Sequence, residues 1–134
     1  MTRAAPRLVA LLLALLASGG CTTTRVEKME TITGTVTYFQ RIAMPPGAVV
    51  EVKLVEARKR KNKTIVATKI TSPGQVPVPY TLVYNPKEMR PDRKYAMQAR
   101  ILVDGKPWYV TQAVNQQMRN GRIAHADIIL KPAQ

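Results

Sequence analysis

The stretch Gly34–Leu54, GTVTYFQRIAMPPGAVVEVKL, decides the fold of this chain. Around its start, apolar Ile32, Val36 and Tyr38 alternate with Thr33, Thr35 and Thr37. Alternation with a period of two is typical of a β-strand with one buried face. The segment Met44–Gly47 then ends the strand, because two prolines lack N–H donors and Gly47 tolerates an unusual φ.

The second half of the stretch alternates again. Val50, Val52 and Leu54 share one face, and Glu51 and Lys53 share the other. The simplest product is an antiparallel pair of strands whose apolar faces contribute to one core. On this register Val52 is a core residue, and replacement of Lys53 by aspartate is expected to be nearly harmless.

The same residues resemble the YscW/YbaY-like bacterial lipoproteins, a family that includes type III secretion lipoprotein chaperones. The run Arg41–Val52 carries the pattern R-I-x-[ML]-P-P-G-A-V-V-E-V, and the resemblance continues through Gly74–Ile101 and Gly105–Thr111. It covers most of the chain after Thr31. It implies an outer-membrane lipoprotein with a small β-sandwich.

The N-terminus has the pattern of a secretory signal peptide. Arg3 and Arg7 precede the apolar run Leu8–Ala17, and small residues lead to Cys21. The run is 10 residues long, whereas a membrane-spanning helix needs about 20. We therefore expect residues 1–20 to be a signal peptide that is removed.

Cys21 is the only cysteine, so no intramolecular disulfide can form. Its position resembles a lipobox, in which the thiol is acylated, although Ser18 stands where leucine is commonest. Ordinary cleavage after Gly19 is the alternative, and it would leave a free thiol in an oxidising compartment. We expect lipidation of Cys21, a flexible tether over residues 21–30, and a folded domain over residues 31–134. Thr22, in place of a retaining aspartate, favours the outer membrane with the domain facing the periplasm.

Further strands are expected over residues 64–70, 80–84, 94–103, 106–111 and 123–130, with a hairpin turn at Asp104–Gly105. A helical turn is expected over residues 86–90, with residues 114–119 as the alternative. About seven short strands predict an all-β protein with an immunoglobulin-like, two-sheet β-sandwich. Its expected core comprises Val36, Val50, Val52, Leu54, Met97, Ala99 and Ile101. Trp108 is expected to anchor the core, and its neighbour Tyr109 to lie on the opposite face.

Residues for catalysis or metal binding are scarce. His125 is the only histidine, Ser18 leaves with the signal peptide, and Ser72 lies in a Pro-Gly turn. The eight carboxylates form neither a catalytic nor a calcium-loop pattern. We therefore expect no enzyme activity, no cofactor, no metal and no small-molecule substrate.

The sharpest local feature is the basic run Arg58, Lys59, Arg60, Lys61, Asn62 and Lys63. It reads either as a solvated loop between two strands or as a contact with anionic lipid, lipopolysaccharide or an acidic partner segment. The whole chain has 21 basic and 8 acidic residues, which favours anionic partners. The signal peptide argues against nucleic acid as that partner.

Two functions follow. The first is a non-enzymatic adaptor or chaperone held on the membrane by its lipid, which binds a segment of an envelope protein through its sheet. The resemblance makes this pilotin-like and implies the C-terminal segment of a secretin as one such partner. The alternative is a surface-associating lipoprotein whose basic loop binds anionic lipid, lipopolysaccharide or another acidic polymer.

Overall fold

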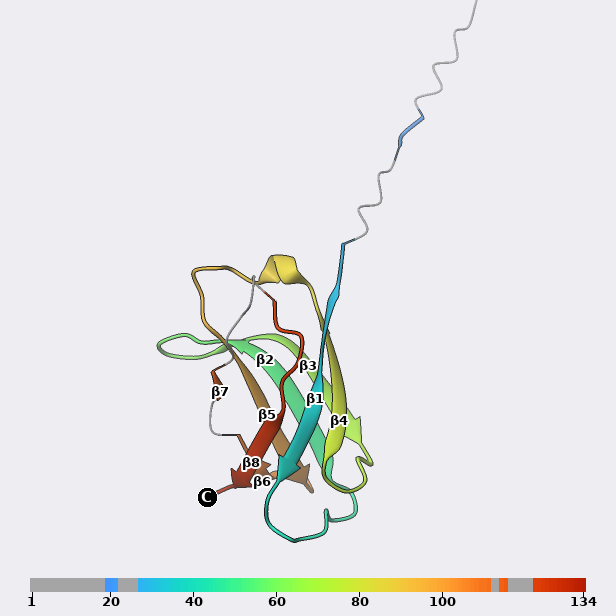
Figure 1. Cartoon of the computed structure of the whole chain (residues 1–134), viewed down its shortest axis with the longest axis vertical. Helices are drawn as coiled ribbons and strands as arrows, with labels where there is room; N and C mark the ends of the chain where they lie inside the picture. Colours follow the sequence, from blue (N-terminus) through green and yellow to red (C-terminus); the bar gives the residue numbers. More distant parts are fainter. Residues whose placement is uncertain (1–18, 22–26, 112–113, 116–121) are drawn as a thin grey trace, which may run out of the picture.

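The computed structural model describes residues 19–21, 27–111, 114–115 and 122–134 (Figure 1). Its elements are β1 (Glu30–Tyr38), β2 (Val49–Glu56), β3 (Lys63–Thr71), β4 (Val78–Tyr84), the 3-10 turn η1 (Pro86–Glu88), β5 (Tyr95–Val103), β6 (Lys106–Val110), β7 (Val114–Asn115) and β8 (Ile128–Pro132). No helix in these residues is long and apolar enough to cross a membrane.

The strands form one nearly closed sheet with the order β3-β2-β5-β6-β8-β1-β4, and β7 pairs with β5. All neighbours are antiparallel except β1 and β8, which run parallel. The all-β prediction with about seven strands is confirmed. The two layers expected of a sandwich are joined through β8, which pairs with β6 on one side and with β1 on the other.

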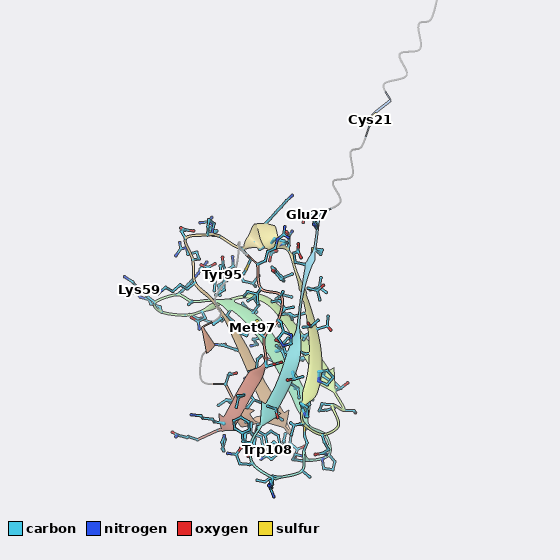
Figure 2. The ribbon with its side chains drawn as sticks, in the orientation of Figure 1. Cys21, Glu27, Lys59, Tyr95, Met97 and Trp108 are labelled. Atoms are coloured by element: carbon cyan, nitrogen blue, oxygen red, sulfur yellow. The ribbon has the colours of Figure 1, made fainter. Side chains whose placement is uncertain are left out.

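The core fills the interior of this sheet. All seven residues predicted for it are buried, with exposed fractions between 0 and 4%: Val36, Val50, Val52, Leu54, Met97, Ala99 and Ile101. Figure 2 places Met97 in the middle of the molecule, between its two ends. The alternation in β1, β2 and β5 therefore gave the correct register, because a shift of one residue would turn these side chains outward.

The last strand begins later than predicted. Residues 123–127 do not form a continuous strand; His125 makes an isolated bridge to Thr33, and β8 starts at Ile128. This segment runs beside β1 in the same parallel register as β8, and at Gly34 a Cβ would lie only 1.8 Å from the carbonyl oxygen of Ala126. A glycine is therefore required at position 34 because the two backbones approach so closely.

The predicted turns are present. Asp104 and Gly105 have φ values of 51° and 75°, as a mirror-image hairpin turn requires. Gly47 has a φ of 77°, and the Gln75 side chain accepts a hydrogen bond of 2.8 Å from the Met44 N–H. The helical turn predicted over residues 86–90 corresponds to η1. Its alternative over 114–119 begins with β7, and residues 116–119 lie outside the described residues.

The aromatic residues of β6 differ from the prediction. Tyr109, with 3% of its surface exposed, is the buried residue, and Trp108 is half-buried against the core. Tyr38 stacks on Tyr109 with 4.6 Å between ring centroids and meets Trp108 edge-on at 5.6 Å. Trp108 therefore lies at one end of the nearly closed sheet, which we call the barrel (Figure 2), and is not its central anchor, because the alternation along β6 points Tyr109 inward.

Candidate functional site

The loop between β2 and β3 holds the predicted basic run. Arg58, Lys59, Arg60, Lys61 and Lys63 are all exposed. The Arg58 N–H donates a hydrogen bond of 3.2 Å to the Asn62 side chain, which closes the loop. The run joins the two strands as expected. Whether it contacts a partner stays a prediction.

Arg58 differs from the other cations of the loop because it pairs with a buried carboxylate. Its Nε lies 3.0 Å from Oε1 of Glu56, a residue with only 4% of its surface exposed. Arg93 approaches the same oxygen at 3.8 Å. A buried carboxylate needs such partners because its desolvation is costly. Glu56 therefore connects the loop to the turn before β5, and Arg58 has a structural role.

The second basic cluster lies beside the loop. Arg90, Arg93 and Lys94 border the turn into β5, and the Ala57 N–H donates a 2.8 Å hydrogen bond to the Lys94 carbonyl. Residues 57–59 and 92–94 line one open hollow between these segments. Two segments that are distant in the sequence thus present their cations together.

η1 brings a further cation to this end of the barrel. Lys87 lies 3.8 Å from the carboxylate of Glu27, which also accepts a hydrogen bond from Asn85. A second hollow, of about 390 Å³, is lined by Lys63, Thr64, Ile65, Lys87, Glu88 and Arg90. Glu27 thus holds the chain, six residues after Cys21, against this basic region.

We call these cations the basic collar: Arg58, Lys59, Arg60, Lys61, Lys63, Lys87, Arg90, Arg93 and Lys94. Segments 56–63 and 87–94 contain these nine cations and three carboxylates, a net charge of 9 − 3 = +6. Figure 2 shows Lys59 and Glu27 in the half of the molecule from which the chain leads to Cys21, with Trp108 at the opposite end. Cys21 itself is exposed.

Glu51 forms an ion cluster that the sequence did not reveal. It faces outward as predicted but has only 4% of its surface exposed. Its carboxylate lies 2.9 Å from Lys53 Nζ, 3.2 Å from Arg100 Nη2 and 3.9 Å from Lys69 Nζ. Burial raises its pKa, but the hydrogen bond from Lys53 and the nearby positive charges outweigh this and hold the pKa below 4.5.

This cluster corrects the prediction for Lys53. An aspartate at that position would remove the nearest cation from Glu51 and place a second carboxylate beside it, so we now expect the replacement to destabilise the fold. The cross-strand pairs of Glu51 with Arg100 and with Lys69 were the signal that could have shown the cluster. These pairs can be identified only when the strand order is known, and the sequence alone does not give that order.

His125 and Asp127 fasten the segment before β8 to β1. His125 Nε2 lies 3.2 Å from the Asp127 carboxylate, which also accepts hydrogen bonds from the N–H and hydroxyl of Thr35. The hydrogen bonds from His125 and Thr35 lower the pKa of Asp127. Among the described residues, no group of three histidine, cysteine or acidic side chains could hold a metal ion. The contacts of His125 and Asp127 hold the segment before β8 against β1.

Comparisons with known proteins agree with this architecture. Residues 27–130 match the family model described as type III secretion system lipoprotein chaperone (YscW). The uncharacterized lipoprotein YbaY of Escherichia coli K12 is 30% identical over 106 residues, which cover 77% of this chain and 55% of that protein. The chain thus spans about half the length of this relative.

A solved structure of an alternative pilotin from the type II secretion system of Vibrio cholerae is also similar. It has a TM-score of 0.71 and 30% sequence identity, covering 80% of this chain and 99% of the pilotin chain. The similarity therefore includes nearly all of that protein.

Proposed function

This chain belongs to the type III secretion system lipoprotein chaperone (YscW) family, and on that premise we propose that it is a lipid-anchored envelope chaperone that binds a segment of a secretin or another envelope protein. The observation that carries the proposal is the similarity over 99% of a pilotin chain. The chain would work by binding and delivery, without enzymatic chemistry. Its acylated Cys21 would hold it on the periplasmic face of the outer membrane.

The division of the chain suits such a carrier. Residues 1–20 would direct export, residues 21–30 would form the lipidated tether, and residues 31–134 would form the binding domain. Two or more acyl chains give stable anchoring because each buried methylene contributes about 0.8 kcal/mol. A tether beside a compact sheet would leave most of the domain surface available to a partner.

The test is made in cells that carry the gene and its secretin. Deleting the gene should reduce the amount of secretin multimer in the outer-membrane fraction, and wild-type protein supplied in trans should restore it. Cys21→Ser protein should not restore it, because the carrier would no longer be anchored. Unchanged secretin multimers in the deletion strain would contradict the secretin version of the proposal.

A second candidate function is supported by the position of the basic collar. The collar is at the end of the barrel where Glu27 enters the fold, so a lipid on Cys21 would hold these cations close to a membrane surface. Each basic residue near an anionic surface contributes about 1 kcal/mol of attraction. The collar would then strengthen attachment to anionic phospholipid or lipopolysaccharide. Salt separates this role from segment capture, because screening weakens exposed charge contacts much more than apolar and main-chain contacts.

A further inference from the structure

β3 is an unusual strand because its inward side is incompletely covered. β2 buries six of its eight residues and β4 buries alternate residues, whereas β3 has no fully buried residue. Val66 and Ile70 pair across the sheet with the fully buried Leu54 and Val50, yet both remain partly exposed. The core therefore reaches the surface along β3.

The cause is the seam between β3 and β4. These strands are the two ends of the strand order, and no pairing joins them within the described part of the chain. Figure 1 shows them together near their short connection, while β4 continues up to η1 and β3 begins at the basic loop. In this view the two strands diverge toward the collar. The open end of the seam is the hollow of about 390 Å³ between the start of β3 and η1.

The side chains around this open end favour a ligand of one kind of charge. Lys63, Lys87 and Arg90 provide three positive charges, Glu88 provides one negative charge, and Ile65 provides apolar surface. β3 itself, KTIVATKIT, is rich in β-branched residues and contains neither proline nor a carboxylate. Such an edge readily accepts another strand.

The positive charge of the chain determines which kind of strand the β3 edge accepts. Lys63 and Lys69 lie on this edge, and the whole chain has a net charge of +13. Like charges would repel the β3 edge of a second copy, which is how natural edge strands avoid self-association. An extended segment with alternating apolar and acidic residues would instead gain main-chain hydrogen bonds, apolar contact and charge attraction together.

We propose that the free edge of β3 and the hollow beside η1 bind an extended acidic segment of a partner protein. The segment would lie along the first half of β3, with an apolar side chain over Ile65 and carboxylates toward Lys63, Lys87 and Arg90. This inference rests on the proposed chaperone function, and it gives the location and chemistry of the segment that the chaperone binds.

The binding test uses the full chain in detergent micelles and a fluorescein-labelled peptide of alternating glutamate and valine. Anisotropy gives the affinity for three proteins: wild type, Lys63→Gln/Lys87→Gln/Arg90→Gln, and the matched loop variant Lys59→Gln/Arg60→Gln/Lys61→Gln. Both variants lose three positive charges. The first should bind about tenfold or more weakly, and the loop variant no more than about threefold more weakly. Equal losses would overturn the proposal, because they would show attraction to the overall charge only.

Two further measurements test the binding mode. Hydrogen exchange of the β3 amides should slow when the peptide is added, and a glutamine–valine peptide should bind much more weakly than the glutamate–valine peptide. Unprotected β3 amides would overturn strand addition. We call the Lys63→Gln/Lys87→Gln/Arg90→Gln protein the hollow variant. The wild type could fail to bind the peptide but sediment with anionic vesicles, with only the hollow variant losing that sedimentation. The hollow would then be a lipid site and the proposal would be wrong.

Cell experiments separate this proposal from the proposed function. A hollow variant that fails to restore secretin multimers, beside a loop variant that restores them, would support both. A hollow variant that restores them fully would overturn the location but leave the chaperone function in place. Unchanged multimers in the deletion strain would count against the secretin function itself, whatever the peptide measurements show.

Discussion

The structure separates the cations of the basic loop into one with a structural role and three that are exposed and can contact an anionic surface. This division can be tested. Lys59, Arg60 and Lys61 are exposed, whereas Arg58 pairs with the buried Glu56 at 3.0 Å. Neutralising the three exposed cations to glutamine should weaken binding to anionic vesicles by about 3 kcal/mol, from about 1 kcal/mol per basic residue. That is a loss of about 100-fold in affinity. The melting temperature should hardly change.

Arg58→Gln should behave in the opposite way. It removes one surface charge, so vesicle affinity should fall only about fivefold. It also leaves Glu56, 4% exposed, with Arg93 at 3.8 Å as its remaining ion-pair partner. Because Arg58 is itself half-exposed, we expect a loss of about 1–2 kcal/mol in the free energy of unfolding. For a domain of this size that lowers Tm by roughly 5–10 °C.

The assay pairs vesicle co-sedimentation with thermal unfolding, on chains that begin at residue 21 and carry Cys21→Ser so that no lipid contributes. The sedimentation difference between wild type and the triple variant should disappear near 1 M salt, where the Debye length is about 3 Å. Lys59→Gln is the matched single-charge control for Arg58→Gln. The reasoning is refuted if the triple variant unfolds as early as Arg58→Gln, or if wild type and triple variant sediment equally in low salt.

Cys21→Ser in the full chain should move the protein from the membrane fraction to the soluble periplasm; continued membrane association without fatty-acid labelling of the wild type would exclude lipidation at this residue. Val52→Asp should unfold the domain, because it buries an unpaired charge at a cost of several kcal/mol, and urea unfolding would show it. Lys53→Asp should lower the free energy of unfolding by about 1–3 kcal/mol, and stability equal to wild type would show that Glu51 does not need this partner. The pKa of Glu51 is depressed in the folded state, so its contribution is complete above about pH 4.5 and is lost as the pH falls further; Glu51→Gln should flatten this acid limb in pH-dependent urea titrations, and an unchanged limb would contradict it. Gly34→Ala should prevent correct folding, because a Cβ there meets a backbone oxygen at 1.8 Å, and a well-dispersed NMR spectrum of that variant would contradict this close approach.

The candidate site was only partly visible in the sequence. The run Arg58–Lys63 was evident because charge and turn position are local properties. The sequence did not show that Arg58 pairs with Glu56. It also did not show that cations from a second segment lie near the loop: Lys87, Arg90, Arg93 and Lys94. Both facts depend on the proximity of β2, η1 and the turn before β5. Lys53 shows the same limit, since strand parity gave its face correctly but did not show that it shares Glu51 with Arg100 and Lys69.

The sequence by itself determined the all-β class, the inward faces of β1, β2 and β5, and the turn at Asp104–Gly105. These follow from local alternation and backbone preferences, which act between residues close together in the chain. Only the tertiary structure decided that β8 joins the two layers in parallel with β1, that the segment before β8 passes close against Gly34, and that β3 stands at one end of the order of the described strands. Each of these depends on contacts between residues far apart in the sequence, which an alternating pattern cannot assign because it shows which face is buried and not which strand lies beside it.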